Sequence, residues 1–447
     1  MTERAVALVV LAAGQGSRMQ SDLPKVLHRL GGTALLAHAL AAGRSLDPAQ
    51  IVVVAGHGAK AVTSAVARLD PDARVALQPE QLGTGHAVAQ ALPLLDGFDG
   101  RVVVLYGDTP FIGADTLAAL AAHPADVVVL GFRAADPGRY GRLVVQGDAL
   151  DRIVEYKDAD EATRAITLCN SGVMAADAGL LRDLVAQLSN DNAAGEYYLT
   201  DVVALARAQG RSAAVVTCDE AETLGINTRA ELAAAEAAFQ SRKRLDALEN
   251  GVTMADPATV WFALDTHVGR DAIIGQNVVF GPGVTVESGA EILPFCHLEG
   301  CHVSAGATVG PFARLRPGAE LGGDAHVGNF VEIKNAVLAE GVKVGHLTYL
   351  GDAEVGERTN IGAGTVTCNY DGVGKHRTVI GADAFIGSDT MLVAPVSVGA
   401  RAMTGSGSVI TRDVPDGALA LGRARQVTKP GLAERIMQAL RAARGKA

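Results

Sequence analysis

The chain has 447 residues, enough for roughly three domains. Its formal net charge of −10 at pH 7 argues against nucleic acid as a partner, because a phosphate backbone is bound by clustered Lys and Arg. The apolar N-terminal run is too short to insert into a membrane and lacks a signal-peptide cleavage pattern, and the five cysteines lack zinc-site spacing, so we expect a cytoplasmic protein with reduced thiols.

Residues 1–228 alternate between strand and helix patterns. The strand candidates are continuous aliphatic runs, as expected when helices cover both faces of a sheet. This pattern predicts an α/β, Rossmann-like domain with a mostly parallel sheet, in which ligands bind beyond the carboxyl ends of the strands. The strand candidates are residues 5–11, 51–54, 75–78, 102–106, 127–131 and 213–217, and the helical runs include 35–42, 85–92 and 116–121.

The pattern changes twice after this domain. Residues 229–250 are rich in Ala, Glu, Arg and Leu and predict one linking helix that stops at a glycine. In residues 251–425 aliphatic side chains recur every six positions, which is the hexapeptide repeat of a parallel β-helix. We expect segment 370–377 to interrupt the repeat as a projecting loop. In the tail 426–447, we expect residues 432–444 to form a short basic amphipathic helix or a frayed end. One series of the repeat is Ile274, Phe280, Val286, Ile292 and Leu298.

A glycine-containing loop, residues 11–19, follows the first predicted strand. Gly14 and Gly16 would let backbone N–H groups approach a phosphate, and Arg18 and Lys25 would neutralise it. The two glycines alone indicate no more than a strand–helix turn, and the two cations favour the phosphate site. The whole segment resembles the signature of sugar-1-phosphate nucleotidyltransferases, with Ser17 in place of the usual Thr. We expect Arg18 and Lys25 to stabilise the charge that develops at the transferred phosphorus.

Two further segments end predicted strands of this domain. Asp108 lies where a carboxylate could hold Mg²⁺, although an Asp before Thr-Pro is equally typical of a turn or a helix cap. The phosphate loop at the same edge favours the metal. Residues 78–85 could read a base edge, and by themselves they indicate only a polar turn before a helix.

Together these residues resemble the N-acetylglucosamine-1-phosphate uridyltransferases. In that family the matching positions bind UTP or UDP-N-acetylglucosamine, and those matching Asp108 and Asn227 hold Mg²⁺. Without the resemblance, Asn227 would be interpreted as a helix N-cap and Glu155 as a surface strand residue. The matching positions are Leu11, Ala12, Ala13, Gly14, Lys25, Gln78, Gly83, Thr84, Tyr106, Gly107, Asp108, Gly141, Glu155, Asn170 and Asn227.

His346 is the candidate catalytic residue of the repeat domain. A neutral imidazole can take a proton from an amine that attacks a thioester. A lone His on a β-helix edge is more often simply solvated or hydrogen-bonded. Arg316 and Lys334 change this interpretation, because they follow equivalent hexad positions and should lie together on one face, where two cations would bind a sugar phosphate.

Segments 315–318, 331–334, 345–349, 360–364 and 368–370 resemble the acetyltransferase half of a bifunctional enzyme that joins both domains in this order. The resemblance implies a left-handed parallel β-helix and a homotrimer. It also implies that Arg316, Lys334, Tyr349 and Asn360 bind glucosamine 1-phosphate. Ser406 stands where the family pattern carries Ala. The positions that match acetyl-CoA contacts are Ala363, Asn369, Tyr370, Ser388, Ser406 and Arg423.

The sequence thus predicts a two-reaction enzyme. Its second domain would acetylate glucosamine 1-phosphate with acetyl-CoA, and its first would join N-acetylglucosamine 1-phosphate to UTP with release of pyrophosphate. The product would be UDP-N-acetylglucosamine, a precursor for cell wall synthesis. Two alternatives remain: a monofunctional nucleotidyltransferase whose β-helix only oligomerises, and a non-catalytic assembly protein with the same folds.

Overall fold

The computed structural model describes residues 4–147 and 149–444. The chain separates into two compact units between Arg242 and Lys243, and each unit is described by itself. Within the described residues, no helix is both long enough and apolar enough to cross a membrane.

The first unit is built on a sheet whose main path runs β11–β7–β10–β6–β1–β4–β5. β10 is antiparallel to β6 and β7, and the other pairs along this path are parallel, so the prediction of a mostly parallel sheet is confirmed. β8 and β9 form a hairpin beside β10. The strands are β1 (Val6–Ala12), β4 (Gln50–Ala55), β5 (Arg74–Leu77), β6 (Arg101–Tyr106), β7 (Val127–Arg133), β8 (Arg142–Gln146), β9 (Ala149–Val154), β10 (Leu168–Asp177) and β11 (Ala213–Cys218).

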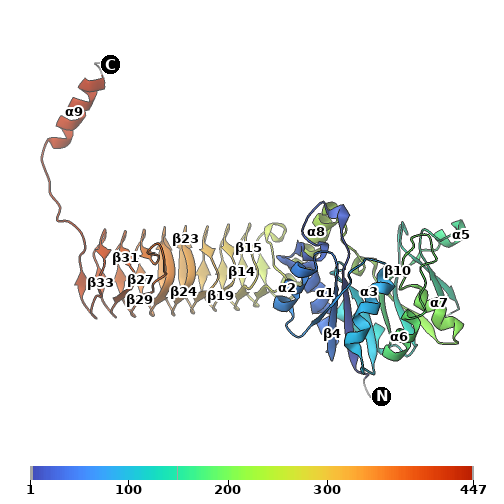
Figure 1. Ribbon diagram of the computed structural model, residues 1–447. Helices are drawn as coiled ribbons and strands as arrows, with labels where there is room; N and C mark the ends of the chain where they lie inside the picture. The colour runs from blue at the N-terminus through green and yellow to red at the C-terminus, as the bar shows by residue number, and fades with distance from the viewer. Residues whose placement is uncertain (1–3, 148, 445–447) are drawn as a thin grey trace. The chain divides into compact units, whose positions relative to one another are not determined.

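Helices cover both faces of this sheet (Figure 1). Alternate residues of β1 enter separate cores: Leu8 and Val10 pack with α1, α2 and α4, whereas Val9 and Leu11 pack with α3, α6 and α7. Both faces of a strand are therefore apolar, which explains the continuous aliphatic runs in the sequence. The helices are α1 (Leu35–Arg44), α2 (Ala59–Leu69), α3 (Thr84–Ala91), α4 (Ala114–Ala122), α5 (Glu161–Arg164), α6 (Ala178–Val185) and α7 (Asp201–Ala208).

The second unit is a parallel β-helix, in which short strands stack in register from coil to coil (Figure 1). Ile274 pairs with Ile292, and Leu298 pairs with Leu315, so aliphatic residues stack on their equivalents 17 or 18 positions later. The hexapeptide-repeat prediction is confirmed. The strands used below are β23 (His326–Asn329), β24 (Glu332–Leu338), β25 (Lys343–His346), β26 (Tyr349–Val355), β27 (Asn360–Ile361), β28 (Val366–Cys368), β29 (Thr378–Ile380), β30 (Phe385–Ile386) and β33 (Met403–Thr404).

Two helices complete the chain. α8 (Arg229–Glu249) contains the boundary between the units and occupies the segment where the sequence predicts a linking helix. α9 (Leu432–Arg444) has no buried residue and lies in the predicted tail 426–447, of which residues 445–447 are outside the described part. A loop separates β28 from β29 where the repeat was expected to be interrupted.

Candidate functional site

A cavity of about 310 Å³ lies at the carboxyl ends of β1, β5 and β6 in the first unit. Since these strands are parallel, the residues that follow them meet at one edge of the sheet. Ten of the predicted substrate-binding residues line it: Leu11, Ala12, Ala13, Gly14, Lys25, Gln78, Gly83, Thr84, Tyr106 and Asp108. Gly107 is adjacent, because its N–H donates to the carbonyl of Leu11 at 3.0 Å.

The two loop glycines have different roles. A Cβ on Gly16 would lie 2.7 Å from the Cβ of Lys25, and Gly16 has φ +64°, so only glycine fits without displacing the lysine. A Cβ on Gly14 would meet no atom within 4 Å. Gly16 therefore lets the loop close onto Lys25, while Gly14 leaves free space beside the cavity.

Lys25 connects the two predicted metal ligands. Its Nζ forms a salt bridge with Oδ2 of Asp108 and donates to Oδ1 of Asn227 at 2.9 Å. The Asp108 carboxylate thus faces the cavity, and the interpretation as a helix cap is wrong.

Asn227 is not a helix cap either. The α8 N-terminus is capped by Thr228, whose Oγ1 accepts from the N–H of Glu231 at 3.1 Å, while the Glu231 carboxylate accepts from the N–H groups of Thr228 and Asn227. This reciprocal capping box leaves the Asn227 amide free to reach Lys25. The first helical residue, Arg229, then donates to the carbonyl of Met19 at 3.2 Å, which ties α8 to the end of the glycine loop.

The donors at this point suit a magnesium ion. The described residues contain no group of three or more His, Cys, Asp or Glu that could hold a metal by themselves. Mg²⁺, however, usually takes one or two protein oxygens and completes its shell with water and substrate phosphates. The oxygens of Asp108 and Asn227 already converge on one cation, the Lys25 ammonium, and so fit such a site.

The segment after β5 is held in place by residues near 197. Gly83 has φ +108°, and a Cβ there would lie 2.6 Å from the carbonyl oxygen of Tyr197. The N–H of Tyr197 donates to the Leu82 carbonyl at 2.8 Å, and Thr84 Oγ1 accepts from the N–H of Leu199 at 3.1 Å. The side chain of Gln78 is buried, and its Nε2–H donates to the Gly83 carbonyl at 3.1 Å. The amide oxygen of Gln78 therefore points away from the Gly83 carbonyl.

Gly141, Glu155 and Asn170 lie together next to this cavity but do not line it. The N–H of Asn170 donates to the Gly141 carbonyl at 2.9 Å, and a Cβ on Gly141 would lie 3.4 Å from the Glu155 carboxylate. Burial raises the pKa of Glu155, although a hydrogen bond from Thr200 opposes the shift. Glu155 is therefore not an ordinary surface strand residue. Burial, followed by the nearby Glu155 and Asp108, also raises the pKa of Tyr106.

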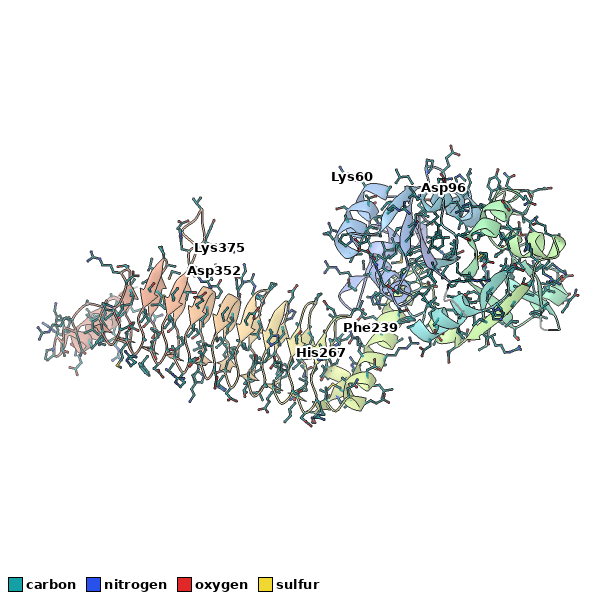
Figure 2. All side chains as sticks on the ribbon, turned by 90° about the horizontal axis from the view of Figure 1, so that it is seen from below. Lys60, Asp96, Phe239, His267, Asp352 and Lys375 are labelled. Atoms are coloured by element: carbon teal, nitrogen blue, oxygen red, sulfur yellow. The ribbon has the colours of Figure 1, made fainter. Side chains whose placement is uncertain are left out.

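The second unit carries a cavity of about 390 Å³ beside the projecting loop. Leu315 pairs with Ile333, so Arg316 and Lys334 follow in register on adjacent coils. The Lys375 ammonium, followed by Arg316, lowers the pKa of Lys334, as expected when cations crowd together. Arg316 also pairs with Glu332 at 2.7 Å. In Figure 2, Lys375 lies on the loop that projects from the β-helix, next to Asp352 on its wall.

Asp352 lines this cavity and accepts hydrogen bonds from two asparagine side chains. The donors are Asn335, at 2.5 Å, and Asn369. Burial alone would raise its pKa, but these two amides and the nearby lysines hold the pKa of Asp352 below its ordinary value. Gly351 pairs in register with Lys334 on the preceding coil. A Cβ on Gly351 would lie 2.4 Å from the Tyr349 hydroxyl, so glycine at this position leaves room for the tyrosine side chain.

His346 ends β25 and does not line the 390 Å³ cavity. Its Nδ1 lies 2.6 Å from Oδ1 of Asn329 in the preceding coil. The register of β25, β27, β30 and β33 places Ala363, Ser388 and Ser406 after His346, one per coil, on the same corner. Arg423 lies near Gly405 and Gly407 at the end of this corner. Asn360 is on the outer face of β27, and Tyr370 is exposed on the projecting loop.

Comparison with known proteins fits both units. Residues 8–168 match the family model of the MobA-like NTP transferase domain, and residues 377–412 match that of the bacterial transferase hexapeptide (six repeats). The Bifunctional protein GlmU of Paracoccus denitrificans is 80% identical over 445 residues, covering 100% of both chains. The protein of that name from Cereibacter sphaeroides (strain ATCC 17025) is 73% identical over 446 residues (99% of this chain, 98% of the relative), and that from Jannaschia sp. is 66% identical over 445 residues (99% and 98%).

The chain belongs to the GlmU family. Membership confirms the prediction of a bifunctional enzyme with uridyltransferase and acetyltransferase activity, in preference to a monofunctional transferase or a non-catalytic assembly protein.

Some features of the two sites do not follow from the sequence. Arg18 is exposed, does not line the cavity and forms no salt bridge with any described residue. The sequence predicts only that Lys375 lies in the projecting loop; the signal for a role is a single lysine inside an interruption of a regular repeat. From the sequence, no role is predicted for Asn329. Its position 17 residues before His346, one coil of the β-helix, is the signal that places it beside the histidine. Gln81 lines the cavity and belongs to segment 78–85, for which the sequence predicts contact with a base edge. The cavity residues without a predicted role are Val26, Ala87 and Glu196.

Proposed function

We propose that the first unit binds UTP and N-acetylglucosamine 1-phosphate in the 310 Å³ cavity and transfers the uridylyl group. An oxygen of the sugar phosphate attacks the α-phosphorus of UTP, and the bond to pyrophosphate breaks, so no protein nucleophile is needed. The observation that carries this proposal is the contact of one ammonium, Lys25, with both Asp108 and Asn227 at the edge of the cavity.

Lys25 is positioned to pass from Asp108 to a phosphate oxygen, where its charge would stabilise the transition state. Arg18, exposed on the same loop, would reach the phosphates from outside. Asp108 and Asn227 would hold Mg²⁺, which when bound neutralises phosphate charge and makes the phosphorus more electrophilic.

The remaining residues would select the substrate. Gln78 uses its amide N–H₂ on the Gly83 carbonyl, so its amide oxygen can accept a hydrogen bond from a uracil N–H. The cluster of Gly141, Glu155 and Asn170 would hold the sugar through its hydroxyl and amide groups.

In the second unit, we propose acetyl transfer from acetyl-CoA to glucosamine 1-phosphate. The amine attacks the thioester carbonyl, His346 takes the proton from the amine, and the thiolate of CoA leaves and is protonated. Arg316, Lys334 and Lys375 would bind the sugar phosphate, since their positive charges lie close to one another. Of the three, Lys375 lines the 390 Å³ cavity. Tyr349 and Asn360 would contact the sugar. Acetyl-CoA would lie along the corner that begins at His346, with contacts from Ala363, Asn369, Tyr370, Ser388, Ser406 and Arg423.

A homotrimer is supported by an apolar ladder on the β-helix, formed by Phe295, Phe312, Phe330 and Leu347. All four side chains are about half exposed, and all four residues have positive φ, an unusual backbone for bulky residues. Phe295 and Phe312 stack with ring centroids 4.8 Å apart. The ladder ends directly after His346, so a second copy that covered it would also enclose the acetyl-transfer site.

UTP and acetyl-CoA are cytoplasmic metabolites, so we place the protein in the cytoplasm and expect neither membrane insertion nor nucleic acid binding. The Lys25→Gln variant tests the first site. Its uridylyl transfer should fall by about 10² or more, because a charge on the transferred group loses its partner, whereas acetyl transfer should be unchanged. Unchanged pyrophosphate release by the folded variant would contradict the proposed site.

A further inference from the structure

The ring of His346 has one hydrogen-bond partner among the described side chains, Asn329. Val327 pairs with Val344 and Asn329 pairs with His346, so the two residues occupy equivalent positions on adjacent coils. Oδ1 of Asn329 lies 2.6 Å from Nδ1 of His346. An amide oxygen can only accept, so the proton on the ring must reside on Nδ1.

The backbone forces this approach. A Cβ on Gly328 would lie 1.9 Å from the carbonyl oxygen of Gly345, so the coils come closest directly before the pair. The N–H of Leu347 donates to the Asn329 carbonyl at 3.1 Å, and Thr348 Oγ1 donates to the His346 carbonyl at 2.7 Å. These contacts fix the backbone around His346. The Asn329 side chain then sets the rotation and the tautomer of the His346 ring.

We propose that Asn329 is a positioning residue for acetyl transfer, which holds His346 in the tautomer whose Nε2 lone pair faces the substrate amine. This inference rests on the proposed role of His346 as the base. A base that must accept a proton on Nε2 needs its hydrogen on Nδ1, and a fixed ring orientation avoids the loss of rate that follows from a misplaced group.

The choice of an amide has a chemical consequence. A carboxylate at this position would also orient the ring, but it would favour the charged imidazolium, which cannot act as a base. β25 pairs with β23 and β27, and the other titratable side chains on these three strands are His326 of β23 and Lys343 of β25. Those on β26, which begins three residues after His346, are Tyr349, Asp352 and Glu354. No ion pair joins a described residue to the His346 imidazole. Asn329 therefore orients the ring without stabilising its inactive form.

The test uses the full-length variants Asn329→Ala and Asn329→Asp, with His326→Ala as a control on the outer face of the same strand. In Asn329→Ala, kcat for acetyl transfer should fall at least about tenfold across the pH range, with the KM for acetyl-CoA unchanged. Asn329→Asp keeps the acceptor, so it should recover rate at high pH, and the acidic limb of its pH–rate profile should move to higher pH. Uridylyl transfer and His326→Ala should be normal.

Full kcat with an unshifted profile in Asn329→Ala would overturn the proposal, and so would an effect confined to the KM for acetyl-CoA, which would make Asn329 a binding contact. Should Asn329→Ala not fold, the nearly isosteric Asn329→Asp decides, because an unshifted acidic limb contradicts the proposal by itself. A parallel His346→Ala variant distinguishes failure of the proposed base from failure of the positioning role. If His346→Ala keeps acetyl transfer, the assignment of His346 as the base fails. If His346→Ala loses acetyl transfer and Asn329→Ala keeps it, only the role of Asn329 fails.

Discussion

Nζ of Lys25 donates to Oδ1 of Asn227 at 2.9 Å, although the two residues are 202 positions apart in the chain. Lys25 follows the first strand of the sheet, and Asn227 directly precedes the capped start of α8. The polar edge of the cavity is therefore assembled from the two ends of the first unit, and the position of Asn227, a proposed metal ligand, depends on how α8 begins.

Metal removal should affect only one of the two reactions. The proposed magnesium ligands Asp108 and Asn227 lie beside the first cavity, whereas the proposed acetyl-transfer site depends on positive side chains and a histidine. Treatment with EDTA should abolish uridylyl transfer, and added Mg²⁺ should restore it. Acetyl transfer that stopped on metal removal would contradict the assignment.

Gly83→Ala should impair uridylyl transfer more than stability explains. Gly83 has φ +108° and ψ 175°, a region in which an alanine is strained by about 1–3 kcal/mol, and the alanine Cβ would also push against the Tyr197 carbonyl. Gly97→Ala is the matched control, because Gly97 also has positive φ, +72°, but a Cβ there meets no atom within 4 Å. Thermal unfolding should show a loss in both variants, and only Gly83→Ala should raise the KM for UTP. Equal kinetics in the two would argue against a binding role for this turn.

Glu155→Gln should stabilise the protein at neutral pH while weakening sugar binding. Because burial raises the pKa of Glu155 in the folded state, its contribution to stability is complete below the unfolded pKa and is lost as the pH rises through the folded one. The unfolding temperature of the variant should exceed that of the parent at pH 7, with the difference shrinking toward pH 4, and the KM for the sugar phosphate should rise. The exposed Glu340→Gln serves as control; the same difference at both pH values in Glu155→Gln would contradict the argument.

Phe312→Glu should dissociate the assembly. A carboxylate in the middle of the apolar ladder would be buried without a partner in a trimer, but solvated in a monomer. Sedimentation should show a trimer for the parent and for Leu77→Glu, which changes an exposed leucine of the first unit, and smaller species with reduced acetyl transfer for Phe312→Glu. A stable, fully active monomer of the parent chain would refute the trimer.

The sheet and the β-helix were predictable because buried positions recur at regular intervals in the sequence and carry apolar residues. β1 is apolar along its whole length, since both of its faces are covered, and the aliphatic residues of the coils recur because each stacks on its equivalent. β10 was not predicted. It runs antiparallel to its neighbours, and its register with β7 shifts between Asn170 and Met174, where Gly172 makes room for the Tyr106 ring.

Site residues were predictable where a motif directly follows a strand, as at Gln78 and Asp108. Glu196 and Lys375 approach their cavities from loops that carry no periodic pattern. The sequence alone does not locate the cap of α8, because both Asn227 and Thr228 are good N-caps and only the reciprocal bond with Glu231 identifies Thr228.

The most direct test of two independent sites follows both reactions on the same purified variants, Asp108→Asn and His346→Ala, with circular dichroism as a check on folding. Asp108→Asn removes a charge with little change of shape and should strongly reduce uridylyl transfer while acetyl transfer stays near normal. His346→Ala should reduce acetyl transfer by about 10²–10⁴ and leave uridylyl transfer unchanged. A folded His346→Ala variant with full acetyl transfer, or equal loss of both activities in either variant, would contradict the account.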